Sequence, residues 1–346
     1  MSDVQPSPLA ELVKTRIREF MREPGYVFWV FGFPLLLAFG LGLAFRDKQP
    51  EPPRVAVVAE ADPARTRALF QSPVVKAESM PLKDAEHALG RSKVDLVVDA
   101  RGADIVMRLD PAQEKARLAR AVADSVLQSG AGRRDPLPVR EQTVSEHGSR
   151  YIDFLLPGLI GLNLMGSSMW GIGFNLVLAR KRRLLRRYAV TPMRHSHFLL
   201  AYFFSRCTFL ALELALLVGF GKLIFDTTIQ GSIPGLILAS FLGAAAFAGI
   251  SLVVGARLDN TEVANGWMNF VQLPMWIVSG SFFSYERFPE WLQLPIRVLP
   301  LTAVTDALRS IYNDGASLAA VSFELSVLAG WSVLGFAIAL KTFRWQ

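Results

Sequence analysis

The 346-residue sequence contains few groups that could catalyse a reaction. The segment GSSMWG, residues 166–171, places two serines in an apolar stretch, and a serine nucleophile needs a base beside it. The four histidines of the chain are at positions 87, 147, 195 and 197, and we expect none of them at the depth of that stretch. We therefore interpret the small residues of 166–171 as a surface for close helix packing.

Two further kinds of chemistry find no support. The string VGFGKL, residues 218–223, lacks both the glycine spacing of a phosphate-binding loop and the Ser or Thr that would hold magnesium. His195 and His197 flank a serine, but a metal site needs a third and a fourth ligand, and no cysteine lies nearby. We therefore predict no catalytic residue, no metal site and no cofactor held by this chain. The single cysteine, Cys207, lies in an apolar stretch and is expected to be a small packing residue.

A block of cations follows an uncharged stretch of the chain. Six of the eight positions in 180–187 are Lys or Arg, and they supply six units of a formal net charge of +7. A nucleic-acid-binding protein normally spreads its cations over a face, so we predict no nucleic-acid partner. A one-sided cationic loop is also what fixes the orientation of a membrane protein, and we favour that interpretation.

Two charged residues lie inside an apolar segment. Arg206 and Glu213 are seven positions apart, which places them on one face of a helix about two turns from each other. That separation exceeds the spacing of a simple i,i+4 ion pair. We expect Arg206 to extend toward the membrane surface. For Glu213 two alternatives stand: a functional position facing the bundle interior, or an ion pair with another helix.

The composition indicates an integral membrane protein. Only 19% of residues are charged, against about 25% in a typical soluble domain. A membrane-spanning helix needs about 20 mostly apolar residues. Six segments approach that requirement, namely 27–45, 154–179, 197–225, 234–256, 263–285 and 318–340.

The basic residues outside these segments predict their orientation. Lys and Arg concentrate before the first segment, between the second and third, and after the sixth, with Arg257 between the fourth and fifth. With six spans all four regions lie on the same side, which the positive-inside rule assigns to the cytoplasm. The sequence therefore predicts a multi-pass membrane protein with both termini in the cytoplasm.

Three regions lie outside the spans. Residues 1–26 contain an amphipathic helix, with apolar positions at helical spacing, that we expect to lie along the membrane surface before the span 27–45. Residues 46–150 alternate strand-like segments, PRVAVVAE, VDLVVDA and DIVMRLD, with helix-like segments, DPARTRALF, LKDAEHALG and PAQEKARLARAVADSVLQSG. This alternation predicts a small α/β extracytoplasmic domain between the first and second spans. The remaining spans occupy 151–346, and residues 284–315 should form short helices at the outer interface, or be partly re-entrant.

Two blocks of sequence resemble type-2 ABC transporter permeases. The first opens with YIDFLLPG and closes with the Thr-Pro before the third span, and its matching positions include Asp153, Pro157, Gly158, Thr191 and Pro192. The second covers residues 273–315. Its matching positions include Pro274, Ser279, Gly280, Pro300 and Arg309. The order of one span, an outer domain and five spans is also that of the longer bacterial members of this family.

The resemblance implies partners and roles. By this resemblance, a second permease, an identical copy, and two cytoplasmic ABC ATPase subunits that carry ATP and Mg would complete the transporter. A coupling helix at 180–192 and the loop at 257–262 would contact the ATPases, and membrane lipids would surround the spans. The residues implied in coupling are Arg180, Lys181, Arg182, Arg183, Arg186, Arg187, Thr191, Pro192 and Asp259.

The expected function is export of a hydrophobic or amphipathic compound, such as a drug, a lipid-like molecule or a metabolite. Two alternatives remain: export of a polysaccharide or glycolipid, and a membrane-anchored sensor or scaffold. Arg180, Lys181, Arg183 and Arg186 stand where relatives often have an Arg-Glu pair, a Gly and a further Glu. We therefore expect an acidic surface opposite this helix, on the ATPase or on the lipid.

Overall fold

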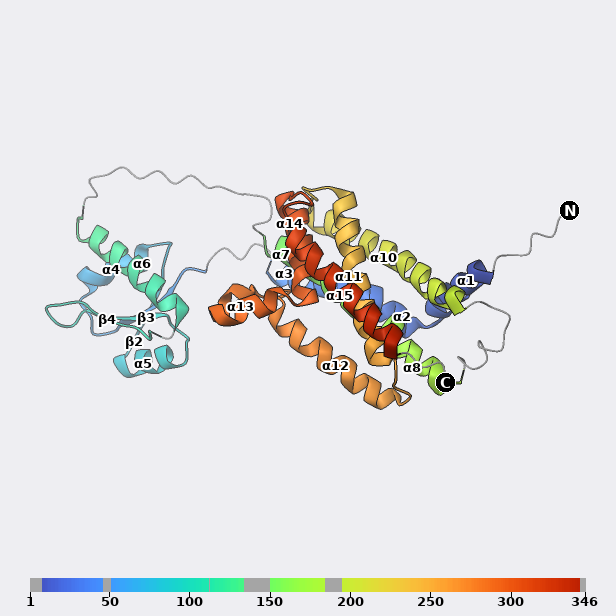
Figure 1. Ribbon diagram of the computed structural model, residues 1–346. Helices are drawn as coiled ribbons and strands as arrows, with labels where there is room; N and C mark the ends of the chain where they lie inside the picture. The colour runs from blue at the N-terminus through green and yellow to red at the C-terminus, as the bar shows by residue number, and fades with distance from the viewer. Residues whose placement is uncertain (1–7, 46–50, 112, 134–149, 184–194, 343–346) are drawn as a thin grey trace. The chain divides into compact units, whose positions relative to one another are not determined.

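The computed structural model describes residues 8–45, 51–111, 113–133, 150–183 and 195–342. The chain divides into two compact units. One comprises Asp47–Val144, and the other comprises Met1–Arg46 together with Ser145–Gln346 (Figure 1). The first unit is an α/β domain, and the second is a bundle of helices.

The α/β unit is built on a four-stranded sheet in the order β2-β1-β3-β4. Strands β1 (Arg54–Val58), β2 (Lys76–Met80) and β3 (Leu96–Asp99) are parallel, and β4 (Val106–Arg108) runs antiparallel to β3. Three helices connect or follow them, α4 (Pro63–Gln71), α5 (Leu82–Gly90) and α6 (Glu114–Gly130).

Alternation along β1 explains how both faces of this sheet are covered. Val55 and Val57 pack with residues of α4 and α6, whereas Ala56 and Val58 pack with residues of α5. Strands buried on both faces are typical of parallel sheets with helices on each side. The sequence predicted every helix of this unit and strands β1, β3 and β4. It did not predict β2, because KAESM is an edge strand whose side chains are exposed or only partly buried and therefore shows no apolar alternation.

Asp99, at the end of β3, is the buried carboxylate of this unit. It accepts hydrogen bonds from Arg101 Nε at 2.9 Å and Nη2 at 2.8 Å, and from Arg108 Nη2 at 3.3 Å. Arg108 also forms an ion pair with Glu86 on α5. The bonds from Arg101, above all, lower the pKa of Asp99 to about 2.

The α/β unit should lose stability in acid through Asp99. Because its pKa is lower in the folded than in the unfolded chain, the carboxylate stabilises the fold above about pH 4, and this contribution is lost as the pH falls toward 2. Pepsin cleavage of β1 and β3 in the full chain should therefore rise steeply over this range. Asp99→Asn should already be susceptible at pH 4, while Asp124→Asn, at an exposed position on α6, should match the wild type at each pH. Identical cleavage of Asp99→Asn and wild type at pH 4 would contradict this role.

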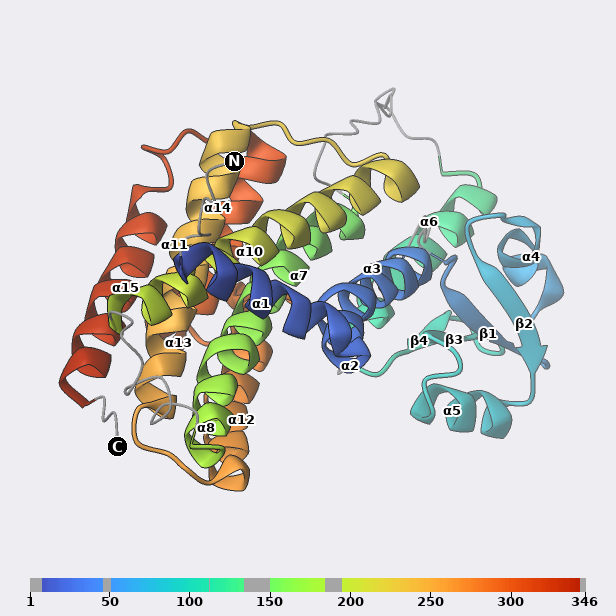
Figure 2. The same ribbon diagram turned by 90° about the vertical axis from the view of Figure 1, so that its right-hand side faces the viewer.

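The helical unit begins with an amphipathic helix that rests on the bundle. Helix α1 (Pro8–Arg22) packs against α10 (His195–Phe225), where the rings of Phe20 and Phe209 lie 4.1 Å apart (Figure 2). The chain then enters a membrane-competent helix made of α2 (Pro24–Val27), a π-helical segment η1 (Phe28–Gly32) and α3 (Phe33–Ala44). Proline is tolerated at the start of α2 because its missing N–H has no partner there in any case.

A second composite helix runs through the centre of the bundle. It comprises α7 (Tyr151–Ser168), the π-helical segment η2 (Met169–Phe174) and α8 (Asn175–Lys181). The window that qualifies it as a membrane span is 83% buried, far more than that of any other candidate span in the described part of the chain. Its core side chains, including Leu164 and Met165, meet Phe247 of α11 (Ile233–Gly255) and Val304 of α14 (Pro300–Asp314).

Five helices in the described residues are long and apolar enough to cross a membrane. They correspond to the predicted spans at 27–45, 154–179, 197–225, 234–256 and 318–340, the last being α15 (Ser322–Thr342). The predicted span at 263–285 corresponds to α12 (Thr261–Val278), which ends seven residues earlier than expected and is not among the five. The chain leaves the helix after Val278 and turns at Gly280, whose φ of 81° is in the left-handed region that glycine adopts freely.

The segment after α12 is more buried than the sequence suggested. A short 3₁₀ turn (Tyr285–Arg287) and α13 (Glu290–Arg297) precede α14. Helix α14 packs against α7, α11 and α15, and most of its residues from Pro300 to Tyr312 are buried. Short helices are therefore present in 284–315 as expected, and α14 belongs to the core of the helical bundle, while their place at the outer interface, or as a partly re-entrant segment, stays a prediction.

Candidate functional site

Arg180 connects the start of the coupling helix to the loop at 257–262, the two regions that the resemblance implies in coupling. It lies in the last turn of α8, and its guanidinium donates to three backbone carbonyls where α11 ends, at Gly255 (3.0 Å), Ala256 (2.8 Å) and Leu258 (2.9 Å). The last carbonyls of a helix have no partner within it, and they carry partial negative charge. A cation at this point satisfies them and fixes the end of α8 to the loop between α11 and α12.

Close backbone contacts support this arrangement, which we call the inner clamp (Arg180, Lys181, Gly173 and Gly255). A Cβ on Gly173 would lie 2.8 Å from the carbonyl oxygen of Ser251, and one on Gly255 would lie 2.9 Å from the carbonyl oxygen of Gly173. Lys181 donates to the hydroxyl of Thr261 at the start of α12. The inner clamp therefore ties α8 to both α11 and α12.

The other implied coupling residues have different positions. Arg182 and Arg183 are exposed, and Arg183 has a φ of 55° where the described helix ends. Asp259 interacts electrostatically with Arg180. Arg186, Arg187, Thr191 and Pro192 lie outside the described residues.

The two sequence blocks that carry the resemblance meet at the other end of the bundle. Asp153 binds Arg150 through both carboxylate oxygens, at 2.9 and 3.0 Å, and Arg150 also donates to the carbonyl of Phe225 at the end of α10. The carbonyl of Asp153 accepts from Asn313 of α14. This cluster, with Gly158 and Arg309, forms what we call the outer junction.

Gly158 and Arg309 bring the turn after α12 onto α7. A Cβ on Gly158 would lie 2.5 Å from the carbonyl oxygen of Ser281, so only glycine permits this contact. Arg309 donates to the carbonyl of Gly280 at 3.0 Å and lies over the ring of Phe154 at 3.9 Å, which is a cation–π distance. The outer junction therefore explains why the motif residues of the two blocks belong together.

The remaining motif residues shape the backbone around the outer junction. Pro157 lies inside α7 and Pro274 inside α12, where neither can donate a helical hydrogen bond. Pro300 begins α14, and Ser279 is buried with its hydroxyl 2.9 Å from that of Ser281.

Arg206 and Glu213 pair directly with each other, which corrects our expectation for Arg206. The distance from Arg206 Nη1 to Glu213 Oε1 is 2.8 Å, and both side chains are nearly or fully buried. Ser168 and Ser167 of α7 bond to Arg206 and Glu213, respectively, at 3.2 Å. Two long side chains can reach each other across two helical turns, and the serines hold them in that geometry. The ion-pair partner of Glu213 is thus on its own helix, so the alternative of an ion pair with another helix is wrong. Glu213 is buried in the bundle, and a functional role for it stays a prediction.

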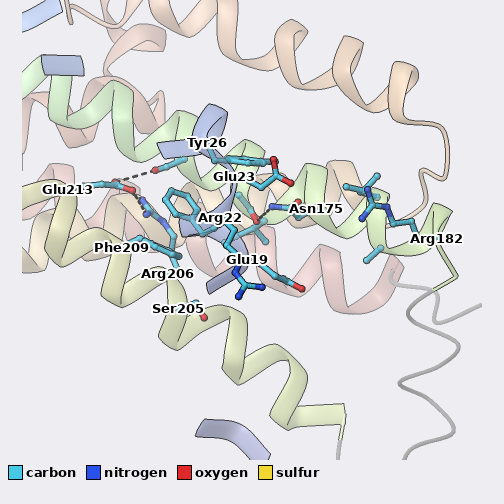
Figure 3. A pocket seen from close by; sticks show the side chains of 16 residues that line it. Glu19, Arg22, Glu23, Tyr26, Asn175, Arg182, Ser205, Arg206, Phe209 and Glu213 are labelled. Atoms are coloured by element: carbon cyan, nitrogen blue, oxygen red, sulfur yellow. Dashed lines mark hydrogen bonds and ion pairs between the residues drawn. The ribbon is translucent and has the colours of Figure 1, made fainter. Parts of the chain in front are cut away.

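This ion pair forms one end of a cavity of about 380 Å³ between α1, α10 and the composite helix α7–η2–α8. Figure 3 shows Glu213 and Arg206 at one end and Arg182 toward the other, with Glu19, Glu23, Tyr26 and Asn175 between them. Sequence reasoning singled out Arg206 and Glu213 as charged residues inside a span, but it predicted neither their pairing nor the cavity. The apolar face of α1 indicated that the helix lies on a surface, but not that its charged residues line a cavity.

Sequence reasoning also missed Arg150 and Asn313. Arg150 precedes the predicted span and carries no pattern of its own, and Asn313 follows an amphipathic stretch. In the described residues, no group of three or more His, Cys, Asp or Glu side chains is arranged to hold a metal ion.

The helical unit, with its buried central helix and the junction of the two sequence blocks, is built as a membrane-embedded helical bundle. The family model described as "ABC-2 family transporter protein" matches residues 24–341, and the chain belongs to this family. With five helices long and apolar enough to cross a membrane in the described residues, it is a multi-pass membrane protein of this family.

A curated relative is similar over part of the chain. The "ABC transporter G family member 20" of Dictyostelium discoideum is 25% identical over 186 residues, which cover 52% of this chain and 25% of that protein. The chain thus spans about a quarter of the length of that relative.

Proposed function

We propose that this chain is the permease of an ATP-driven exporter in the bacterial cytoplasmic membrane, and that it acts as a homodimer with two ATPase subunits. The observation that carries the proposal is the inner clamp. Arg180 and Lys181 connect the end of the central helix to the loop between α11 and α12, so a force applied to either region reaches three helices. The basic run beside the inner clamp offers a docking surface for an acidic face of the ATPase.

Exposed polar residues on α12 are the observation that favours a homodimer. Asn265 and Asn269, one turn apart, are both exposed, and so are Trp267 and Phe270, at 52% and 69%. An amide facing lipid tails has no hydrogen-bond partner and costs several kcal/mol by order of magnitude. A second copy of α12 would cover this face and account for its low hydropathy relative to the five apolar helices. On this proposal α12 is the sixth span, and the transport path lies between the two copies.

The substrate class follows from the walls of such a path. Aromatic and aliphatic side chains with a few amides suit a hydrophobic or amphipathic compound, such as a drug, a lipid-like molecule or a metabolite. On this proposal the α/β unit lies outside the membrane, and the termini lie in the cytoplasm with the basic run. Export of a polysaccharide or glycolipid is the competing function, and transport in vesicles with each class of substrate separates the two.

Co-purification with the ATPase tests the architecture. The full chain should retain a partner that contains a phosphate-binding loop, and Arg183→Glu with Arg186→Glu should weaken that complex by charge repulsion. Arg65→Glu with Arg67→Glu, two reversals on α4 of the α/β unit, should leave it intact. The proposal fails if the purified chain carries no ATPase, and the docking role of the basic run fails if the double reversal leaves binding and ATPase stimulation unchanged.

Cysteine cross-linking tests the homodimer. In a Cys207→Ser background, which removes the single native thiol, Asn269→Cys should give a covalent dimer with a short bifunctional maleimide. Val333→Cys, 71% exposed on α15, should react with the reagent without forming a dimer, because that face is proposed to meet lipid. Equal cross-linking at both positions would indicate random encounters rather than a specific interface.

A further inference from the structure

The cavity between α1, α10 and the central helix opens where membrane-competent helices end. Glu23 and Tyr26 lie at the start of the helix Pro24–Ala44, and Arg182 follows the end of the helix Tyr151–Lys181. Since both ends must lie near the limit of the hydrocarbon layer, the mouth of the cavity lies among lipid headgroups. Helix α1, amphipathic and resting on α10, forms its outer wall at the same level.

The charges that line the cavity balance. Three are acidic, on Glu19, Glu23 and Glu213, and three are basic, on Arg22, Arg182 and Arg206. Arg206 and Glu213 neutralise each other at the inner end. Within the part of the chain that the structure describes, Arg22, Glu23 and Arg182 form no ion pair. The mouth is thus left with two cations, Arg22 and Arg182, and two carboxylates, and it carries no net charge. Of the two carboxylates, Glu19 has an interaction within the chain, so Glu23 is the one offered to a ligand.

The rest of the lining is apolar or aromatic. The rings of Phe20 and Phe209 are in contact between α1 and α10. Ile172 and Leu178 line the cavity from the central helix. Tyr26 and Asn175 add neutral polar groups between the mouth and the ion pair (Figure 3). A ligand for this cavity therefore has a charged end bearing both signs and an apolar remainder.

We propose that this cavity binds the phosphoethanolamine headgroup of a membrane phospholipid. The phosphate lies between Arg22 and Arg182, the ammonium group lies against Glu23, and the glycerol region contacts the aromatic wall. Arginine is well suited to phosphate oxygens because its guanidinium donates two parallel hydrogen bonds. A headgroup bound in this way holds α1 against the bundle, and it requires neither the ATPase nor the transported compound.

Native mass spectrometry of the purified full chain tests this site. After exchange into phosphatidylethanolamine, phosphatidylglycerol or phosphatidylcholine with the same acyl chains, the wild type should retain phosphatidylethanolamine preferentially. Arg22→Gln with Arg182→Gln should lower that retention about tenfold, and Glu23→Gln should do so independently by a similar factor, because each removes a charge-assisted hydrogen bond. Glu23→Gln should leave the retention of phosphatidylglycerol unchanged. All three residues are exposed, so these variants should fold.

Matched controls separate this site from general attraction to lipid. Arg18→Gln removes the same charge from α1 at an exposed position outside the cavity and should leave retention unchanged. Equal retention of the three lipids, or equal loss in the Arg18 control, overturns the proposal. Phosphatidylglycerol retained in preference, with the same arginine dependence, would show an anion site instead. Displacement by soluble glycerophosphoethanolamine at the same concentration as the lipid would show a water-soluble ligand and also overturns the membrane source.

Discussion

Glu213→Gln should destabilise the chain by about 3–5 kcal/mol, because it leaves the guanidinium of Arg206 buried without its counter-charge. Arg206→Met should have an effect of similar size, since Glu213 is 2% exposed and would keep an unpaired carboxylate. The double variant Arg206→Met with Glu213→Leu removes both charges and fills the space with apolar atoms. It should therefore be closer to the wild type than either single variant.

A double-mutant cycle measures this coupling. Unfolding of the purified chain in mixed detergent, followed by tryptophan fluorescence, gives the free energy for each of the four proteins. Glu11→Gln, an exposed carboxylate on α1, should change stability by no more than about 0.5 kcal/mol. If the two single effects simply add in the double variant, the ion pair does not stabilise the fold as a unit.

Gly158→Ala should be the most damaging replacement of a glycine by alanine in the central helix. The added methyl group would lie 2.5 Å from the carbonyl oxygen of Ser281 and 3.1 Å from its Cα, and both are backbone atoms that cannot rotate away. The helix and the turn after α12 would have to separate, at a cost of about 1–3 kcal/mol or more. Separation would also strain the bonds that Arg309 makes to Gly280.

Gly166→Ala is the matched control for this prediction. It lies in the same helix, and a Cβ there would meet nothing within 4 Å. Alanine favours a helix over glycine by up to about 1 kcal/mol, so Gly166→Ala should leave stability unchanged or raise it. In the same detergent, the unfolding midpoint of Gly158→Ala should therefore lie below that of the wild type. The midpoint of Gly166→Ala should equal or exceed it. Similar midpoints would show that α7 and the turn at Ser281 do not pack closely.

The membrane-spanning helices were predicted from long apolar segments, and most elements of the α/β unit from the periodicity of their apolar residues. Five of the predicted spans coincide with membrane-competent helices because each contains a long stretch of about 20 mostly apolar residues with few charges. Helix α12 was harder, since its asparagines and Gln272 lower its hydropathy without changing its helical form. Strand β2 was missed because an exposed edge strand has no apolar face to detect.

The candidate sites depended on contacts that no local pattern reveals. Residue type and the family resemblance together identified Asp153, Gly158 and Arg309, but their meeting with Arg150 and Asn313 joins residues up to 160 positions apart. The pairing of Arg206 with Glu213 depended on the two serines of α7, which the sequence indicated only as small packing residues. Arg180 was predicted to take part in coupling to the ATPase, which stays a prediction, and no local pattern indicated that its guanidinium would also bond to backbone carbonyls of its own chain.

The π-helical segment Met169–Phe174 lies between the two halves of the central helix and sets the angle between the directions in which their side chains point. A π turn holds more residues than an α turn, so it accommodates an extra residue without disturbing the helix on either side. The outer half can keep Gly158 toward Ser281 while the inner half keeps Arg180 toward the end of α11. Loss of one residue from this segment would rotate one half against the other by about 100°. An insertion or deletion at this point would therefore turn different side chains toward each neighbouring helix. It would do so without replacing any of the residues that form the present contacts.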